Sequence, residues 1–479
     1  MGIKSTVYFL AFSLALFNGK VLKAQDVDKQ IQGLSWVKEV GAQAMPKGKK
    51  IFNVAKYGAQ NDGKTLSTKA IQAAIDACYA RGGGIVTFQP GAYLTGSIFL
   101  KKGVTLQIGP NVKLLGSQDI SDYPEINTRV AGIEMKWPAA LINVISQDNV
   151  AITGKGTVFA QGKIFWDKYR KMRQEYDKKG LRWIIDYDCK RPRTLLISGS
   201  SNITVKGITL QQAGFWTVHV LYSKYVTVDG ITIQNNIDGH GPSTDGIDLD
   251  SSSDILVENC DIDCNDDDFC LKSGRDADGL RVNRPAEYIV IRNCLSRAGG
   301  GLLTCGSETS GGIRNVLAQN LKANGTSVGI RLKSAITRGG TVENIYFQNI
   351  EMLKVGNAFD ITMNWNPSYS YSTLPSGYNY DEIPDHWKVM LQKVPEKQGI
   401  PHFRNVYFSN IKVLEAQKAI VAEGMNESPA ENFFFDHVNI VAGTAGQISF
   451  AKNWIFNDLH IQTKDDSKPK LINCSGLNL

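Results

Sequence analysis

The sequence contains no hydrophobic run after residue 24 that is long enough to cross a lipid bilayer, which takes about 20 consecutive apolar residues. No transmembrane helix is therefore expected. Cysteine is also scarce, with eight among 479 residues. The spacing of Cys260, Cys264 and Cys270 does not match a usual zinc site. We expect the cysteines to serve mainly as buried apolar side chains.

The sequence lacks a concentrated basic motif. The chain has 53 basic and 46 acidic residues, which gives a formal net charge of +7. Nucleic-acid-binding proteins usually gather their basic residues in a recognisable motif, and none is present, so we expect no nucleic-acid partner. The mild excess of positive charge is compatible with an acidic substrate.

The first 24 residues have the features of a secretory signal peptide. Lys4 precedes an apolar run over 7–17, and the small residue Ala24 offers a cleavage point before Gln25. We therefore expect residues 1–24 to be removed and the protein to be exported, either to a periplasm or out of the cell. The mature chain is expected to form one domain over 25–479.

A short pattern of alternating apolar residues followed by Asn or Gly recurs along most of the mature chain. The repeats follow one another in steps of about 21 to 34 residues, with one double step of about 61. Repeats of this length, each with one short strand and no helix between them, predict an all-β solenoid of stacked coils. The apolar residue that closes each repeat should form a continuous interior ladder: Ile208, Ile231, Cys260, Cys294, Leu321, Ile350, Ile411, Val438 and Leu459.

Three segments depart from the repeat. A helix is predicted over 68–80, with Thr68 as its N-cap, and it would cover the apolar end of the solenoid. Two long excursions, 162–193 and 364–399, are rich in aromatic residues and are expected to be loops. Long loops in a compact solenoid are usually functional. Their aromatic rings could stack on sugars or could pin the loops to the body.

The densest group of carboxylates lies between residues 243 and 274. Asp245 and the run 266–268 each open a short alternating segment, at 246–250 and 268–272, and such alternation predicts strands. If these strands stack as neighbours, their carboxylates converge on one spot. Converging carboxylates raise one another's pKa, which suits acid/base chemistry. Taken alone, an Asp cluster at a turn would equally fit calcium binding or backbone capping.

Together these motifs resemble glycoside hydrolase family 28, the polygalacturonase family of pectin hydrolases. The resemblance extends from about Phe52 to the last repeats. The family's motifs correspond here to 243–245 (Ser-Thr-Asp), 266–267 (Asp-Asp), 299–301 (Gly-Gly-Gly) and 331–333 (Arg-Leu-Lys). The fold that the resemblance implies is a right-handed parallel β-helix, a pectin-lyase-like solenoid.

The resemblance also implies catalytic roles. Asp266 would protonate the leaving glycosidic oxygen, while Asp245 and Asp267 would hold and deprotonate the attacking water. Counting back from 272–274 (Lys-Ser-Gly) selects this Asp pair and leaves Asp268 outside it. The implied reaction inverts the anomeric configuration, for which acid and base usually stand roughly 6.5–9.5 Å apart.

Arg331 and Lys333 are the candidate substrate-binding cations. They alternate with two aliphatic residues, so in a strand both should point outward. Two cations beside a carboxylate cluster suit a substrate with its own carboxylate, such as galacturonate. The alternative is a salt bridge to Asp248 or Asp250 on a nearby coil.

Two positions depart from the family pattern. Gly300 stands where the family has His, and Ser243 stands where it has Asn. The loss of that His shifts the expected substrate toward rhamnogalacturonan or another branched pectin, and His240 is a candidate replacement in substrate binding. For Glu308 and His219 we expect structural roles, in capping and within a strand.

The sequence thus predicts an exported, monomeric glycosidase that hydrolyses α-linked galacturonate in pectin, either homogalacturonan or rhamnogalacturonan. We expect inversion, exo action and no requirement for a metal or organic cofactor. Three alternatives share the fold: a polysaccharide lyase that uses calcium and a basic residue, a rhamnosidase or other pectin-directed glycosidase, and a pectin-binding protein without activity.

Overall fold

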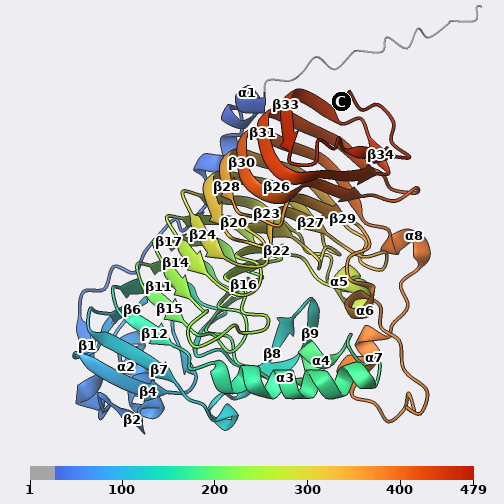
Figure 1. Ribbon diagram of the computed structural model, residues 1–479. Coiled ribbons are helices and arrows are strands. Elements are labelled where there is room, and N and C mark those ends of the chain that lie inside the picture. The colour runs from blue at the N-terminus through green and yellow to red at the C-terminus, as the bar shows by residue number, and fades with distance from the viewer. Residues whose placement is uncertain (1–26, 479) are drawn as a thin grey trace, which may run out of the picture.

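A computed structural model describes residues 27–478 of the chain (Figure 1). The expected signal peptide lies outside the described residues. Thirty-two strands form one continuous sheet that coils along the molecule, while β8 (Glu125–Val130) and β9 (Ile133–Pro138) form a separate antiparallel hairpin. The molecule is a right-handed parallel β-helix, which confirms the predicted fold. Within residues 27–478, every helix is too short or too polar to span a bilayer.

The coils stack into three strips of parallel strands. The first strip contains β1 (Ile51–Asn53), β3 (Gly84–Thr87), β6 (Val104–Ile108), β11 (Asp148–Gly154), β14 (Ser201–Lys206), β17 (Lys224–Asp229), β20 (Ser253–Glu258), β23 (Ala286–Arg292), β26 (Ile313–Asn324), β28 (Thr341–Leu353), β30 (His402–Glu423), β31 (Ala430–Ser449), β32 (Ala451–Lys452) and β33 (Ile455–Thr463). The second contains β2 (Asp62–Leu66), β4 (Gly91–Thr95), β7 (Val112–Gly116), β12 (Thr157–Phe159), β15 (Thr209–Gln211), β18 (Thr232–Gln234), β21 (Asp261–Asp263) and β24 (Leu295–Ala298). The third contains β5 (Ile98–Phe99), β10 (Ile142–Ile145), β13 (Leu195–Ser198), β16 (Val218–Leu221), β19 (Ile247–Asp250), β22 (Phe269–Lys272), β25 (Leu303–Cys305), β27 (Val328–Lys333), β29 (Asn357–Thr362) and β34 (Lys470–Ile472).

The predicted interior ladder is present. All its members are buried except the last, Leu459, which is partly buried. Along the C-terminal coils the ladder is in direct register, with Leu321 opposite Ile350 and Ile350 opposite Ile411. Each aliphatic side chain buried in this way contributes roughly 1.5–3 kcal/mol.

Asparagines stack at the corners of the coils. Asn320 and Asn349 have φ angles of 54° and 56°, in the left-handed region that Asn tolerates better than most residues. The Asn349 amide donates to Asn320 Oδ1 at 3.0 Å, and Asn320 donates in the same way to Asn293. These contacts satisfy the corner side chains and hold successive coils at one spacing.

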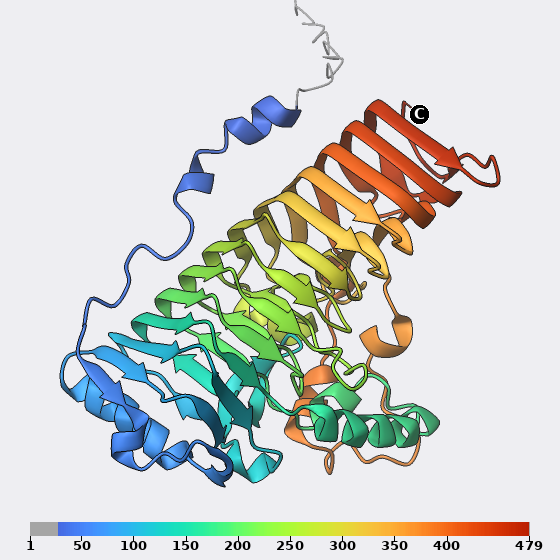
Figure 2. The ribbon, with the colours of Figure 1, turned by 60° about the vertical axis from the view of Figure 1, so that its left-hand side comes forward.

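The helix α2 (Thr68–Ala80) covers the N-terminal end of the solenoid as predicted, but the N-cap prediction was wrong, because Thr68 is the first helical residue and Ser67 occupies the N-cap position. Ile71, Ala74, Ile75 and Cys78 lie on one face of α2 and are fully buried against the first coils. The helix α1 (Val27–Gln32) belongs to an N-terminal segment that runs along the outside of the coils, and it lies near the other, C-terminal end of the solenoid (Figure 2). Val27 and Ile31 of α1 pack on a buried aromatic stack of the C-terminal coils: Tyr346, Tyr407 and Phe434.

The two excursions are not simple loops. Segment 162–193 contains α3 (Lys163–Lys178) and α4 (Ile185–Asp188). Segment 364–399 contains α6 (Pro367–Ser370), α7 (Asp385–Met390) and α8 (Glu396–Gly399), whereas α5 (Asp276–Val282) follows β22. The expectation of loops was wrong for α3, because Phe165, Trp166 and Tyr169 lie on one buried face at helical spacing.

The excursions pack together with the hairpin β8–β9 on one side of the solenoid (Figure 1). We call these three segments, 125–138, 162–193 and 364–399, the wall. Its own apolar cluster includes Trp137, Trp183 and Trp387, and the last two rings meet edge to face with their centroids 5.5 Å apart. Asp188 ties the excursions together because it accepts from Trp387 Nε1 at 2.9 Å and lies 2.5 Å from His386 Nε2.

Candidate active site

The strands β19 and β22 are adjacent and parallel, with Ile247 opposite Phe269. Asp245 lies just before β19, and Asp266 and Asp267 lie just before β22, so the predicted convergence occurs. One carboxylate oxygen from each of these three residues lies within 4.8 Å of the others. We call Asp245, Asp266 and Asp267 the carboxylate triad.

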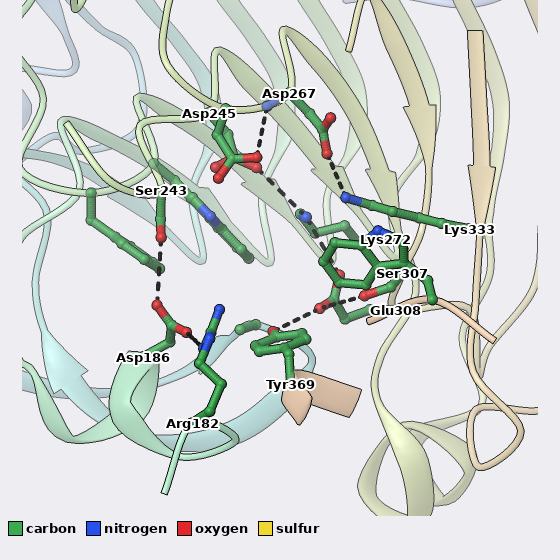
Figure 3. A pocket seen from close by; sticks show the side chains of 15 residues that line it. Arg182, Asp186, Ser243, Asp245, Asp267, Lys272, Ser307, Glu308, Lys333 and Tyr369 are labelled. Carbon is green, nitrogen blue, oxygen red and sulfur yellow. Dashed lines mark hydrogen bonds and ion pairs between the residues drawn. The ribbon is translucent and has the colours of Figure 1, made fainter. Parts of the chain in front are cut away.

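The triad forms one side of a pocket whose other side is the wall (Figure 3). The coils contribute polar residues and two aromatic rings: Phe215, Trp216, Ser243, Asp245, Asp266, Asp267, Lys272, Ser307, Glu308 and Lys333. The wall contributes Ala131, Arg182, Asp186, Trp365 and Tyr369. Both excursions that the sequence marked as functional therefore reach the pocket, together with a hairpin that the sequence did not mark.

Asp267 is held as an anion. Its Oδ2 lies 2.8 Å from Lys333 Nζ, and its Oδ1 lies 3.1 Å from Arg331 Nη1. Oδ1 also accepts a hydrogen bond from Thr304 at 2.8 Å. Burial alone would raise the pKa of Asp267, but Lys333 and Arg331 outweigh it and hold that pKa well below its usual range. Asp267 therefore stays ionised.

The pKa values of Asp266 and Asp245 are raised, in contrast to that of Asp267. Burial raises the pKa of Asp266, and the charge of Asp267 raises it further. The pKa of Asp245 is raised well above its ordinary value by burial and then by Asp248 and Asp266. Carboxyl groups this close titrate as a coupled set. The triad thus contains one carboxylate that stays ionised, Asp267, and two carboxyl groups that hold a proton more readily than usual, Asp266 and Asp245.

Lys272 is a pocket residue that the sequence analysis used only to set the register. Its Nζ lies 3.4 Å from Glu308, 3.5 Å from Asp248 and 3.7 Å from Asp245. Burial lowers the pKa of Lys272, but the surrounding anions raise it well above its ordinary value, so it stays charged. In β22, Phe269 and Leu271 belong to the core, so strand alternation points Lys272 outward, and this was the signal available in the sequence.

Glu308 lines the pocket as well. It accepts from Tyr369 Oη at 3.3 Å and lies against Lys272. Burial raises its pKa, but Lys272 and the other nearby cations, Arg338, Lys333 and Arg275, lower it to about 2. The sequence analysis expected only a structural, capping role for Glu308. In the structure Glu308 lines the pocket and connects Lys272 of the coils with Tyr369 of the wall.

Arg331 and Lys333 point out of the core as predicted, while Ile330 and Leu332 are buried in it. Their ion-pair partner is Asp267, and not Asp248 or Asp250 as the alternative had it. Lys333 Nζ also lies 4.3 Å from the centre of the Trp365 ring. Both cations are therefore already engaged by a carboxylate of the protein.

His240 does not belong to the pocket lining. It is exposed, and its Nδ1 lies 3.0 Å from Asn236 Oδ1. At Gly300, a Cβ would lie only 3.1 Å from the carbonyl carbon of Asp266, so this glycine lets two coils approach closely beside the triad. Ser243, by contrast, does line the pocket, and it donates to Asp186 at 3.5 Å.

His219 is a structural residue, as expected. It is fully buried in β16, with Nδ1 2.8 Å from Arg193 Nη1 and Nε2 3.5 Å from Asp250 Oδ2. Burial lowers its pKa to about 4, so the imidazole is neutral at physiological pH. Asp250 in turn forms a buried ion pair with Arg129 at 2.9 Å. This buried network supports the hairpin of the wall from beneath.

Within residues 27–478, two groups of side chains have the ligand types and the spacing to hold a metal ion. One is the triad itself, and the other consists of Asp245, Asp248 and Cys270. Lys272 contacts both Asp245 and Asp248, and Lys333 contacts Asp267. A metal ion would have to share its ligands with these ammonium groups, which already balance the local negative charge.

Comparison with known proteins gives the family. The model of glycosyl hydrolases family 28 matches residues 93–383, and a second model, rhamnogalacturonase A/epimerase, pectate lyase-like, matches residues 51–114. The chain belongs to glycosyl hydrolase family 28. It is therefore an O-glycosyl hydrolase, as the motifs in the sequence predicted.

Family 28 relatives cover most of the chain. A probable polygalacturonase from Vitis vinifera is 32% identical over 76% of this chain and 74% of its own length. An exo-poly-alpha-D-galacturonosidase from Dickeya chrysanthemi is 28% identical over 63% of this chain and 55% of its own length. The crystal structure of a hyperthermoactive exopolygalacturonase from Thermotoga maritima matches with a TM-score of 0.68 and 26% identity, over 93% of this chain and 96% of that protein.

Proposed function

We propose that the protein hydrolyses α-linked galacturonate at the end of pectic chains, with the carboxylate triad as its catalytic group. The observation that carries this proposal is the convergence of three carboxyl groups at one pocket, where only Asp267 is paired with both Lys333 and Arg331. Asp267 is fixed as an anion, whereas the pKa values of Asp266 and Asp245 are raised. Acid/base hydrolysis needs both a proton donor and an ionised partner.

In this mechanism Asp266 is the general acid that protonates the leaving oxygen. Asp245 takes the proton of the attacking water, and Asp267 orients that water and keeps the site negative opposite the developing positive charge of the sugar. The oxygens of Asp267 are engaged by Lys333, Arg331 and Thr304, which argues against Asp267 as a covalent nucleophile.

The spacing of the triad differs from the expectation for an inverting enzyme. One oxygen of each carboxylate lies within 4.8 Å of the others, compared with the roughly 6.5–9.5 Å that is usual between acid and base. A water molecule that donates to two oxygens at about 2.8 Å each holds them about 4.6 Å apart. Such a bridging water fits this triad, and inversion remains our proposal.

The wall supports exo action. It contributes one side of the pocket through Arg182, Asp186 and Tyr369, so the pocket accommodates a chain end better than the middle of a chain. Two of the relatives described above are named as exo-acting enzymes. Their names also favour galacturonan as the first substrate to test, ahead of the rhamnogalacturonan that the missing His suggested.

We further propose that residues 25–479 form one exported, monomeric domain after removal of residues 1–24. The matched family model and the continuous sheet support a single catalytic unit. The hydrophobic N-terminal run supports export, and its cleavage can be read from the N-terminal sequence of the secreted protein.

The proposed function is tested by sizing the products of homogalacturonan and rhamnogalacturonan oligosaccharides over time. We expect monomeric galacturonate to appear from the start, with the chains shortening one unit at a time. Activity should survive EDTA. A calcium requirement, together with ultraviolet absorbance from a conjugated uronate, would instead identify a lyase. Absence of any turnover on either polymer would favour a binding protein.

A further inference from the structure

Arg182 differs from the other cations of the pocket in how it is held. It lies between α3 and α4, in the wall, and Figure 3 shows it on the side of the pocket opposite Asp245 and Asp267. Its Nη1 lies 2.7 Å from Asp186 Oδ2, and its guanidinium lies 4.9 Å from the centre of the Tyr369 ring. Within residues 27–478 its hydrogen bonds involve Nη1 alone, so Nε and Nη2 can donate to a ligand.

The charge of Arg182 is not fully balanced. Its partner Asp186 also faces the buried Arg191, whose Nη2 lies 3.5 Å from Asp186 Oδ1. Two guanidinium groups therefore share one carboxylate, and one positive charge is left on this side of the pocket. By contrast, Lys333 is paired with Asp267, and Lys272 lies among three carboxylates.

This distribution of charge determines how an acidic sugar would lie in the pocket. The triad would repel the sugar's own carboxylate, whereas the wall offers an arginine with unused donors. A guanidinium binds a carboxylate through two parallel hydrogen bonds, which adds geometric selectivity to the charge attraction. The glycosidic bond can then face the triad while the carboxylate faces the wall.

We propose that Arg182 binds the carboxylate of the terminal galacturonate and makes the enzyme selective for unesterified chain ends. This inference rests on the proposed function, and it assigns carboxylate recognition to the wall instead of to Arg331 and Lys333. A methyl ester removes the negative charge and the second acceptor oxygen, so an esterified terminal sugar loses the contact.

The test compares Arg182→Met with Arg173→Met on trigalacturonate and on its methyl ester. Arg173 is a matched control, because it forms the same i,i+4 pair with Asp177 at 2.7 Å but lies outside the lining of the pocket. Arg182→Met should lower kcat/KM on trigalacturonate by about 10- to 150-fold, as expected for a charge-assisted hydrogen bond. It should change kcat/KM on the ester by less than about threefold, and Arg173→Met should leave both substrates unaffected.

Arg182→Lys keeps the positive charge and should lose part of the preference in kcat/KM for the free acid over the ester. This second variant tests the inference if Arg182→Met does not fold. An equal loss on acid and ester would mean that Arg182 only supports the wall. An unchanged kcat/KM on the acid would also overturn the inference.

Binding separates this inference from the proposed function. In an Asp266→Asn background, calorimetry should show trigalacturonate binding that Arg182→Met weakens by about 10- to 150-fold. If Arg182 governs binding but the unmodified enzyme hydrolyses no galacturonide, the proposed function fails and the recognition role stands. If hydrolysis is normal and binding ignores Arg182, the recognition role alone fails.

Discussion

The coils and the wall build opposite sides of one pocket in different ways. In the coils, each side chain repeats the position of the one in the coil below, and the register of β19, β22, β25 and β27 fixes where the catalytic side chains stand. In the wall, segments about 200 residues apart are held by side-chain contacts, such as those of Asp188 with His386 and Trp387.

We infer from this difference that the coils position the catalytic groups and the wall determines which substrate is bound. A repeated backbone holds the triad rigidly, as acid/base chemistry requires. The wall can vary without disturbing the coils, and it brings Arg182 and Tyr369 to the substrate. We therefore expect changes in the coils beside the triad to alter catalysis on all substrates, and changes in the wall to alter which substrates and which products are seen.

The largest effect is expected from the triad. Asp266→Asn removes the proton donor and should lower kcat on trigalacturonate by about 10²- to 10⁴-fold with an unchanged circular dichroism spectrum. Asp245→Asn should be similarly severe. Asp261→Asn is the control, because Asp261 lies on the neighbouring strand β21 and pairs with the exposed Arg297. Near-normal turnover by Asp266→Asn would exclude the proposed acid.

Lys333→Met should have the next largest effect. It removes the 2.8 Å ion pair with Asp267 and should lower kcat/KM by roughly 10- to 150-fold. Because Lys333 lowers the pKa of Asp267, its loss raises that pKa, and the acidic limb of the pH–rate profile should move to higher pH.

A comparison of substrates distinguishes Lys333 from Arg182. Lys333 is expected to act through Asp267, so its loss should be similar on free and methyl-esterified galacturonides. Lys322→Met, which removes an exposed pair with Glu351, serves as the control. If Lys333→Met lowered kcat/KM only on the free acid and left the pH–rate profile unshifted, Lys333 in the coils would be the residue that binds the substrate's carboxylate.

Trp387→Ala should loosen the wall and leave the triad in place. Trp387 is buried between the excursions and contacts Trp183. We expect kcat on short oligomers to fall by less than about tenfold, and the early products of polymer digestion to include oligomers as well as the monomer. Ile350→Ala in the coil is the counterpart, with about 2–5 kcal/mol of lost stability and no change in product size. Identical product profiles for the two variants would contradict a closing role for the wall.

The smallest effect concerns Glu308 and pH. The pKa of folded Glu308 is about 2 and its unperturbed value is 4.5, so its ionised form stabilises the fold above pH 4.5, and this contribution is lost as the pH falls toward 2. Glu308→Gln should therefore lower Tm at pH 7 by about 2–4 °C. The difference in Tm between the variant and the natural protein should shrink below pH 4.5. A constant difference across this range would mean that the charge of Glu308 does not contribute.

The repeat made the coils predictable from the sequence. One apolar position per coil was enough to predict the interior ladder. The Asp residues at the start of two strands predicted the triad, because residues one repeat apart in the sequence become neighbours when the coils stack. The outward direction of Arg331 and Lys333 followed from strand alternation. Their partner did not follow from it, because Asp267 precedes its strand and its side-chain direction is set by the turn.

The wall was much less predictable. Its aromatic residues marked function, but they did not reveal the helix α3 or the contact of Asp188 with Trp387, since these segments pack on each other and follow no repeat. The hairpin over 125–138 gave no signal of its own. Arg182 was one of many basic residues in its segment, and only the fold shows that it faces the pocket. The signal peptide over 1–24 stays a prediction.

The most direct test of hydrolysis by the triad is the anomeric configuration of the first sugar released. A water molecule bridging Asp245 and Asp267 attacks opposite the leaving group, so proton NMR in the first minutes should show the β anomer of galacturonate, which then equilibrates. Initial release of the α anomer would contradict this. It would make a triad carboxylate, most directly Asp245, a covalent nucleophile.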